Sequence, residues 1–241
     1  MPAGPAGSAG PARSVVVAMC VTAAVTTTAL VVAAVLRQGT RDGGPGAGAR
    51  SGSPAVEAAL RCESGPCRSL SSTTVGGDRV ELLGDPGGGG GRVRMTGPLG
   101  TTVFETNTVQ LGARLTPESL WCAEFGRPVC VVRGADAAGE LFAEVFVGQA
   151  GSWSRVDTVY DSDAGYLELA RVRSPEGLPD VVTVRRACGL AAGPDCRQVV
   201  AQVQGLDGDD VGCTSVAPAR EQLPGWPQVA PRPEQLVPCD Y

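Results

Sequence analysis

Eight cysteines in the later part of the chain limit its fold more than any other sequence feature. An even number of cysteines behind a membrane or secretion signal predicts a disulfide framework, and eight would form four bridges. Eight cysteines allow on the order of 100 pairings, so the count alone does not give the connectivity. The cysteines are Cys62, Cys67, Cys122, Cys130, Cys188, Cys196, Cys213 and Cys239.

The spacing of the cysteines suggests one pairing. Two pairs share the same separation along the chain, and β-like segments flank each of them. A hairpin places two such cysteines opposite each other, within the short Cα–Cα distance that a disulfide needs. A third pair encloses a Gly-Pro turn, and the last pair would pin a Pro-rich tail. The suggested bridges are Cys62–Cys67, Cys122–Cys130, Cys188–Cys196 and Cys213–Cys239.

A zinc site is the alternative use of these cysteines. Zinc sites made of four cysteines usually contain C-x2-C pairs, and the chain has none. The chain also has no histidine, which excludes His-containing zinc sites and catalysis by Ser-His-Asp or Cys-His groups within it. We therefore expect disulfides, each of which contributes about 2–4 kcal/mol to stability.

The second strong feature is Ser14–Leu36, a run without charge or proline. It is long enough to cross a bilayer as one helix, because a crossing takes about 20 apolar residues. The alternatives are a cleavable signal peptide and a buried core helix. The run exceeds the usual apolar core of a signal peptide, which favours a retained signal anchor, while Ala33 and Ala34 still allow a cleavage site.

The cysteines, and not the flanking charges, predict the orientation of this segment. Arg13 precedes it and Arg37 and Arg41 follow it, so the positive-inside rule does not favour a cytoplasmic N-terminus. Disulfides persist in oxidising compartments. We therefore expect a single-pass protein of the cell membrane whose C-terminal domain is extracytoplasmic, or a secreted protein if the segment is cleaved.

These features divide the chain into five parts. We expect a short cytoplasmic tail at residues 1–13, the transmembrane signal-anchor helix at 14–36 and a Gly-rich flexible linker at 37–54. The linker offers almost nothing that a core could bury. A β-rich extracytoplasmic domain follows at 55–215, and a Pro-rich C-terminal tail, pinned to that domain, at 216–241.

From residue 55 onward, the apolar residues alternate or form short runs between turn signals, which is typical of strands. Helix is scarce: Ala55–Arg61 suggests two helical turns, and Thr116-Pro117-Glu118 resembles a helix start that does not continue. The expected strands are Arg79–Leu83, Arg92–Met95, Thr102–Leu111, Ser119–Cys122, Val129–Val132, Leu141–Val147, Ser154–Tyr160, Tyr166–Val172, Val181–Arg185 and Gln198–Val203.

Two observations suggest repeated units. Cys62, Cys122 and Cys188 open similar hairpins roughly 60 residues apart. Leu178–Val184 resembles the end of an FG-GAP-type repeat, in which a Gly/Pro turn leads to an Asp and a valine-rich strand. The preceding Arg173–Gly177 lacks that family's Asp-rich calcium loop, so the resemblance covers strand chemistry only. We expect an all-β fold, a disulfide-stapled antiparallel β-sheet domain of sandwich or partial propeller-like type, preceded by one transmembrane helix.

The best candidate for a cation site is the acidic turn Asp207-Gly208-Asp209-Asp210. Calcium takes several oxygen ligands on a flexible turn, which Asp207, Asp209 and Asp210 can supply. An EF-hand would need a glutamate further on, and Val211–Cys213 does not provide one. The alternative is a solvated acidic turn, in which case no cofactor is expected. A weaker acidic group consists of Asp157, Asp161 and Asp163.

Two other sets of side chains could carry a function. A glycosidase needs two carboxyl groups at a suitable distance, and the sequence indicates no particular pair. A carbohydrate or peptide platform needs several aromatic rings on one face, whereas we expect Trp121, beside Cys122, to pack on a disulfide. The glutamates are Glu105, Glu118, Glu124, Glu140, Glu144 and Glu168, and the main aromatic residues are Trp121, Phe125, Trp153, Tyr160 and Tyr166.

The composition narrows the function class further. The net charge is −5, so no nucleic-acid partner is expected. All basic residues are arginine, which together with the Gly, Ala and Pro content indicates a GC-rich bacterial genome. We expect a non-enzymatic, membrane-anchored binding module of a bacterial cell envelope, whose partner is an unknown protein or a cell-wall glycan. The alternatives are an anchored or secreted envelope hydrolase with paired carboxylates and a purely structural, calcium-stabilised domain.

The disulfide hypothesis predicts the thiol content of the native protein. Mass spectrometry under non-reducing conditions, with alkylation of the unfolded chain, should find no free thiol after residue 50, because all eight cysteines there are oxidised. Two or more alkylated cysteines in that part of the chain would overturn the argument for an oxidising compartment. The orientation of Ser14–Leu36 would then lose its support.

Overall fold

A computed structural model describes residues 60–62, 65–85, 89–189 and 196–239, all of which lie within one compact unit, Gly52–Tyr241. The expected membrane segment, Ser14–Leu36, and the expected linker at 37–54 lie outside the described residues. Within the described ranges, no helix has the length and apolar character that a bilayer crossing requires. The membrane anchor therefore stays a prediction.

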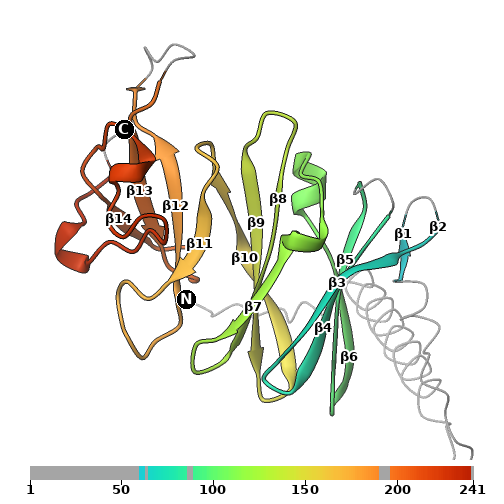
Figure 1. Cartoon of the computed structure of the whole chain (residues 1–241). Coiled ribbons are helices and arrows are strands. Elements are labelled where there is room, and N and C mark those ends of the chain that lie inside the picture. The colour runs from blue at the N-terminus through green and yellow to red at the C-terminus, as the bar shows by residue number, and fades with distance from the viewer. Residues whose placement is uncertain (1–59, 63–64, 86–88, 190–195, 240–241) are drawn as a thin grey trace, which may run out of the picture. The chain divides into compact units, whose positions relative to one another are not determined.

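Three four-stranded antiparallel sheets follow one another along the chain, and within each sheet every strand pairs with its neighbours in sequence (Figure 1). A short two-stranded ladder, β1 (Arg61–Cys62) with β2 (Gly65–Pro66), precedes them. Sheet 1 consists of β3 (Arg68–Val75), β4 (Asp78–Gly84), β5 (Gly91–Gly97) and β6 (Gly100–Glu105). Sheet 2 consists of β7 (Leu120–Glu124), β8 (Pro128–Ala135), β9 (Leu141–Gln149) and β10 (Ser152–Ser162). Sheet 3 consists of β11 (Leu167–Ala170), β12 (Asp180–Arg186), β13 (Val199–Gln204) and β14 (Asp210–Cys213).

The predicted all-β, antiparallel character is confirmed, and most expected strands overlap an observed one. Four strands were missed. The two-residue strands β1 and β2 lie where a helix end and a Gly-Pro turn were expected. The others are β3, whose exposed positions are polar, and β14, which begins inside the acidic turn at Asp210. The expected strand Thr102–Leu111 is too long, because the chain leaves β6 and forms a 3-10 turn at Thr108–Leu111. Most of the expected helix Ala55–Arg61 lies outside the described residues, and Arg61 itself belongs to β1.

The predicted disulfides are present, and the pairs are those that the spacing suggests. Cys122 of β7 and Cys130 of β8 stand directly opposite each other in the ladder, with a Cα–Cα distance of 4.0 Å. Cys213–Cys239 links β14 to the C-terminal segment across a Cα–Cα distance of 5.1 Å. The four bridges therefore close three local loops and fix one terminal segment.

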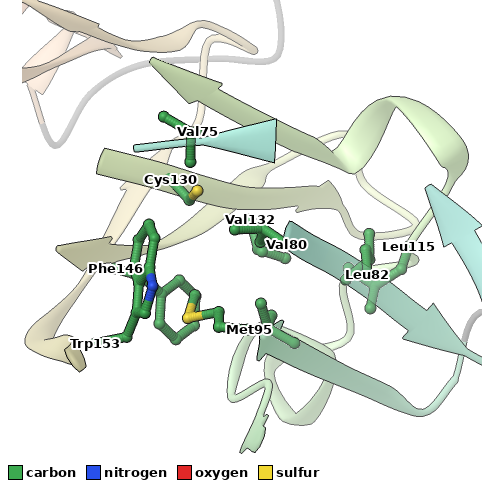
Figure 2. Packing of buried hydrophobic residues seen from close by; sticks show 10 residues of the cluster. Val75, Val80, Leu82, Met95, Leu115, Cys130, Val132, Phe146 and Trp153 are labelled. Carbon is green, nitrogen blue, oxygen red and sulfur yellow. The ribbon is translucent and has the colours of Figure 1, made fainter. Parts of the chain in front are cut away.

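Sheets 1 and 2 pack through a cluster of buried apolar side chains (Figure 2). Alternate side chains along the strands of sheet 1 reach this cluster, while the opposite face carries charged residues such as Glu81 and Arg94 together with the buried Leu83. The rings of Phe104 and Phe146 meet at its edge with centroids 5.2 Å apart. The cluster contains Val75, Val80, Leu82, Val93 and Met95 from sheet 1, Leu115 from the connection, and Cys130, Val132, Phe146 and Trp153 from sheet 2.

A buried hydrogen bond fixes how these two sheets meet. The indole Nε1 of Trp153 donates to Oδ2 of Asp78 at 2.8 Å, and both side chains are buried. Gly97 lies against the same carboxylate, because a Cβ at this position would stand 2.0 Å from Oδ1 of Asp78. The carboxylate therefore occupies space that only a glycine on β5 leaves open.

One buried carboxylate interrupts the apolar run of β9. Oε2 of Glu144 accepts the backbone N–H groups of Asn107 and Thr108 at 2.8 and 3.3 Å, and Nη1 of Arg155 lies 3.3 Å from Oε1. Burial raises the pKa of Glu144, while these donors act against the shift by stabilising the charge. The contacts tie the connection after β6 to sheet 2.

The other face of sheet 2 packs against sheet 3 through a second apolar cluster. It includes Val129 and Val145 of sheet 2 and Leu167 and Val181 of sheet 3. The hydroxyl of Tyr160 crosses this joint and donates to the carbonyl oxygen of Gly205 at 2.9 Å. Sheet 2 is thus covered on both faces, which explains why its inner strands read as continuous apolar runs and not as an alternation.

The segment after β14 covers the far face of sheet 3. Leu223 and Val229 are buried against the valines of β12 and β13. Cys213 and Val237 exchange both backbone hydrogen bonds, each at 2.8 Å, beside the Cys213–Cys239 disulfide. The Tyr166 hydroxyl accepts the N–H of Val229 at 2.7 Å. Residues 214–239 therefore form a layer of the core, although they contain no regular strand.

Two buried tyrosines, Tyr160 and Tyr166, predict how the stability of the fold depends on pH at high pH. Burial raises the pKa of Tyr160 and of Tyr166 to about 12, from about 10 in the unfolded chain. The protonated form is favoured by the fold, so this contribution to stability is complete below pH ~10 and is lost as the pH rises through about 12. Phenolate absorbance should show two of the three tyrosines ionising late in the native protein.

The same titration in denaturant is the control, because unfolded tyrosines should ionise together near pH 10. Three tyrosines ionising near pH 10 in a chain that circular dichroism shows to be folded would contradict the buried positions of Tyr160 and Tyr166.

Candidate ligand-binding groove

The groove starts from β7, the edge strand of sheet 2 next to β8. Side chains alternate between the two faces of a strand. Leu120 and Cys122 therefore turn toward sheet 1, where they pack on the first apolar cluster. Trp121 turns to the opposite face, stands across from Val131 of β8, and remains 45% exposed.

A cavity of about 130 Å³ lies beside Trp121. Its floor is apolar and comes from Val131 of β8 and from Leu167 and Leu169 of β11. Arg133 and Glu168 complete the lining. We call this site the Trp121 groove. It brings together the edge strands of two different sheets, β7 and β11.

Two arginines and one glutamate set the charge of the groove. Arg133 donates from Nη1 to the carbonyl oxygen of Leu167, and the same nitrogen lies 3.8 Å from Oε1 of Glu168. Beyond Trp121, the guanidinium carbon of Arg171 stands 5.3 Å from the ring centroid of Phe125. The lining therefore holds one guanidinium and one carboxylate beside the exposed indole, and Arg171 adds a second guanidinium next to the groove.

Aromatic side chains extend the groove along the end of β7. The rings of Trp121 and Phe125 meet edge to face with centroids 6.2 Å apart. An indole edge of this kind offers a large apolar surface with little rotamer freedom to lose. Such a surface suits the binding of a flat or apolar group. The side chains of the groove include no pair of carboxyl groups for acid–base catalysis.

The expectation for Trp121 was wrong. We expected it to pack on the Cys122–Cys130 disulfide, but neighbouring strand residues point to opposite faces, so Trp121 and Cys122 lie on different sides of sheet 2. The sequence reasoning also missed Arg133, Leu169 and Arg171. No local motif joins them to Trp121, because the groove forms only when sheet 3 packs on sheet 2.

The acidic turn lies between β13 and β14. Asp207 is 3.7 Å from Nη1 of Arg173 and accepts the N–H of Asp209 at 3.3 Å. Asp210 accepts a hydrogen bond from Nε2 of Gln202 at 3.3 Å. In the described parts of the chain, no group of three or more acidic or cysteine side chains is arranged to hold a metal ion. A calcium site at Asp207, Asp209 and Asp210 stays a prediction.

Three of the six candidate glutamates, Glu105, Glu144 and Glu168, lie within 4 Å of an arginine. Glu105 pairs with Arg92 at 3.0 Å, and Glu168 lies near Arg133 in the groove. Glu140 differs, because burial and the nearby Asp161, Asp136 and Asp163 raise its pKa, while Arg185 opposes the shift. Asp161 is itself 2.9 Å from Nη1 of Arg185. Glu140 is therefore part of an acidic group with Asp161.

A larger cavity of about 650 Å³ opens at another place along sheets 2 and 3. Its apolar lining includes Val156 and Leu178. Of its charged lining residues, Arg173 lies 3.7 Å from Asp207 and also donates from Nε to Asp180 at 2.6 Å. Arg127 donates to the side chain of Gln149 at 3.3 Å. The cavity lacks an exposed aromatic ring, so the Trp121 groove remains the better candidate for recognition.

Comparisons with protein-family models, with curated proteins and with solved structures found no match to this chain.

The two tryptophans of sheet 2 should differ sharply in their effect on stability. Trp121→Ala should change the free energy of unfolding by less than about 1 kcal/mol, because the side chain is half exposed and lies outside the buried clusters. Trp153→Phe should lower it by about 1–3 kcal/mol, because the buried Asp78 loses a hydrogen-bond donor. Denaturant unfolding with the disulfides intact measures both. A larger loss for Trp121→Ala would show that the indole supports the fold.

Proposed function

We propose that this chain is a non-enzymatic binding module of a bacterial cell envelope, anchored in the membrane by Ser14–Leu36 and displayed outside the cytoplasm. The observation that carries the proposal is the Trp121 groove, where an exposed indole lies beside apolar side chains and the guanidinium of Arg133. Large aromatic side chains and arginines are enriched where proteins bind partners. The four disulfides support the extracytoplasmic location.

The chemistry of the groove supports binding over catalysis. Glu168, the carboxylate of the groove, lies near Arg133 and accepts the Tyr166 hydroxyl at 3.2 Å. A glycosidase needs two carboxyl groups at a suitable distance, whereas Glu168 is the one carboxylate that lines the groove. These contacts suit a residue that orients Arg133 at the rim.

The sheet arrangement supports a finer description of the domain. We infer that the three meander sheets form a partial propeller-like stack. Four-stranded antiparallel meanders are the units that propellers repeat, and the three sheets here follow one another in sequence order. The stack gives the module a rigid frame on which edge strands such as β7 and β11 can carry a binding site.

An envelope hydrolase is the second candidate. One observation favours it: Glu140 has a raised pKa next to Asp161, and glycosidases use a protonated carboxylic acid beside a second carboxylate. A panel of cell-wall glycans incubated with the full-length chain should show no turnover under the binding proposal. Hydrolysis that Glu140→Gln abolishes, while Glu118→Gln leaves it intact, would replace the binding proposal with the hydrolase.

Site-directed cross-linking in intact cells tests the binding proposal directly. A photoreactive amino acid at position 121 of the full-length chain should give a discrete adduct, because the groove is occupied by a partner. The same group at Leu99, which is 76% exposed on the turn of sheet 1, is the matched control and should give none. The absence of an adduct at position 121, or equal adducts at both positions, would contradict the proposal.

A further inference from the structure

The edge of β11 carries backbone groups that point toward the Trp121 groove. β11 pairs with β12 alone, so its other side is an edge of sheet 3. The N–H of Val184 donates to the carbonyl oxygen of the opposite Tyr166 at 3.0 Å. In an antiparallel ladder, hydrogen-bonded pairs alternate with pairs whose backbone groups face outward. The register therefore turns the N–H and C=O groups of Leu167 and Leu169 away from β12.

The groove forms because sheet 2 extends by one strand beyond the edge of sheet 3. The contact from Arg133 to the carbonyl of Leu167 places the outer edge of β11 over β8. Sheet 2 continues by one more strand, β7, and it is there that Trp121 is exposed. A fifth strand added to sheet 3 beside β11 would lie over β7, and its inward side chains would cover the indole.

The charges at this edge indicate which kind of strand fits. In the lining, the charge of Arg133 is opposed by the carboxylate of Glu168. Outside the lining, Arg171 adds a guanidinium against Phe125, whose ring meets that of Trp121. Arg171 stacks on Phe125 at the end of β11, where an added strand would pass. A segment with acidic side chains would meet these guanidinium groups favourably, whereas a basic segment would be repelled.

We propose that the Trp121 groove binds an extended segment of a partner protein, which pairs with the outer edge of β11 as a fifth strand. Its backbone bonds to the outward groups of Leu169, an apolar side chain packs on Trp121, and an acidic side chain faces Arg171. Strand addition of this kind takes affinity from the main chain and specificity from alternate side chains. The inference rests on the proposed function, since it names the partner chemistry of the same groove.

Synthetic peptides with the full-length chain provide the test. The probes are labelled ten-residue peptides in which Val or Phe alternates with Glu, the same peptides with Lys in place of Glu, and copies N-methylated at every second amide. Fluorescence anisotropy measures affinity, and hydrogen exchange measures protection of the segment Leu167–Ala170. A member of the acidic set should bind at least about tenfold more tightly than its basic copy and slow exchange in that segment.

Variants and chemical controls separate strand addition from adhesion to an aromatic surface. N-methylation of the amides that face β11 should weaken binding at least about tenfold, because it removes the donors of the ladder. Trp121→Ala should weaken it to a similar degree, while Leu99→Ala should leave it unchanged. Arg171→Glu should reverse the preference between acidic and basic peptides, and Arg232→Glu, a control at a side chain that is 71% exposed, should not.

The outcomes distinguish this inference from the proposed function. Failure of every acidic peptide to bind at millimolar concentration, or binding that N-methylation does not affect, overturns strand addition. Binding of cell-wall glycan fragments that depends on Trp121 but leaves exchange at Leu167–Ala170 unchanged also overturns it, in favour of a carbohydrate ligand. In either case an adduct at position 121 in cells would keep the binding module, whereas its absence removes the proposed function itself.

Discussion

The burial of sheet 2 on both faces is the constraint on which the rest of the described structure depends. Every residue of Val129–Val132 and of Ala143–Val147 is buried. Without a solvent-facing side, these strands need a partner layer on each face. The carboxylate of Glu144 is fully buried, and a buried charge is costly unless hydrogen-bond donors surround it. Asn107, Thr108 and Arg155 supply them, so the connection after β6 is held by an inner strand of sheet 2.

Apolar layers attract without direction, so a second kind of contact must fix how the sheets meet. At the joint between sheets 1 and 2, the indole N–H of Trp153 finds the carboxylate of Asp78. At the joint between sheets 2 and 3, the hydroxyl of Tyr160 finds the carbonyl of Gly205. A slip of either sheet would leave a buried polar group without its partner. Each joint therefore combines many apolar contacts with one directional bond.

The parts of the fold that local patterns encode could be predicted, and the parts that depend on packing could not. Alternation and turn residues predict most strands, and the hairpin spacing of Cys122 and Cys130 predicts their bridge. β3 was missed because its outward residues are Ser and Thr, which weakens the apolar pattern. The groove was missed because Trp121 and Leu169 meet only through the stacking of two sheets. The alternation of side chains along a strand would by itself have placed Trp121 and Cys122 on opposite faces of the sheet.

The same alternation gives neighbouring residues of β7 different roles, one in stability and one in binding. Leu120 and Cys122 join the core between sheets 1 and 2, so they hold the strand in place. Trp121 points the other way, toward a position that β11 does not reach. An indole there adds little to the core, yet a short rigid strand, linked to β8 by a disulfide, fixes its orientation. A preorganised aromatic side chain loses little conformational entropy when a partner covers it. The strand that closes one core can therefore offer its other face for binding, because the two tasks use alternate residues.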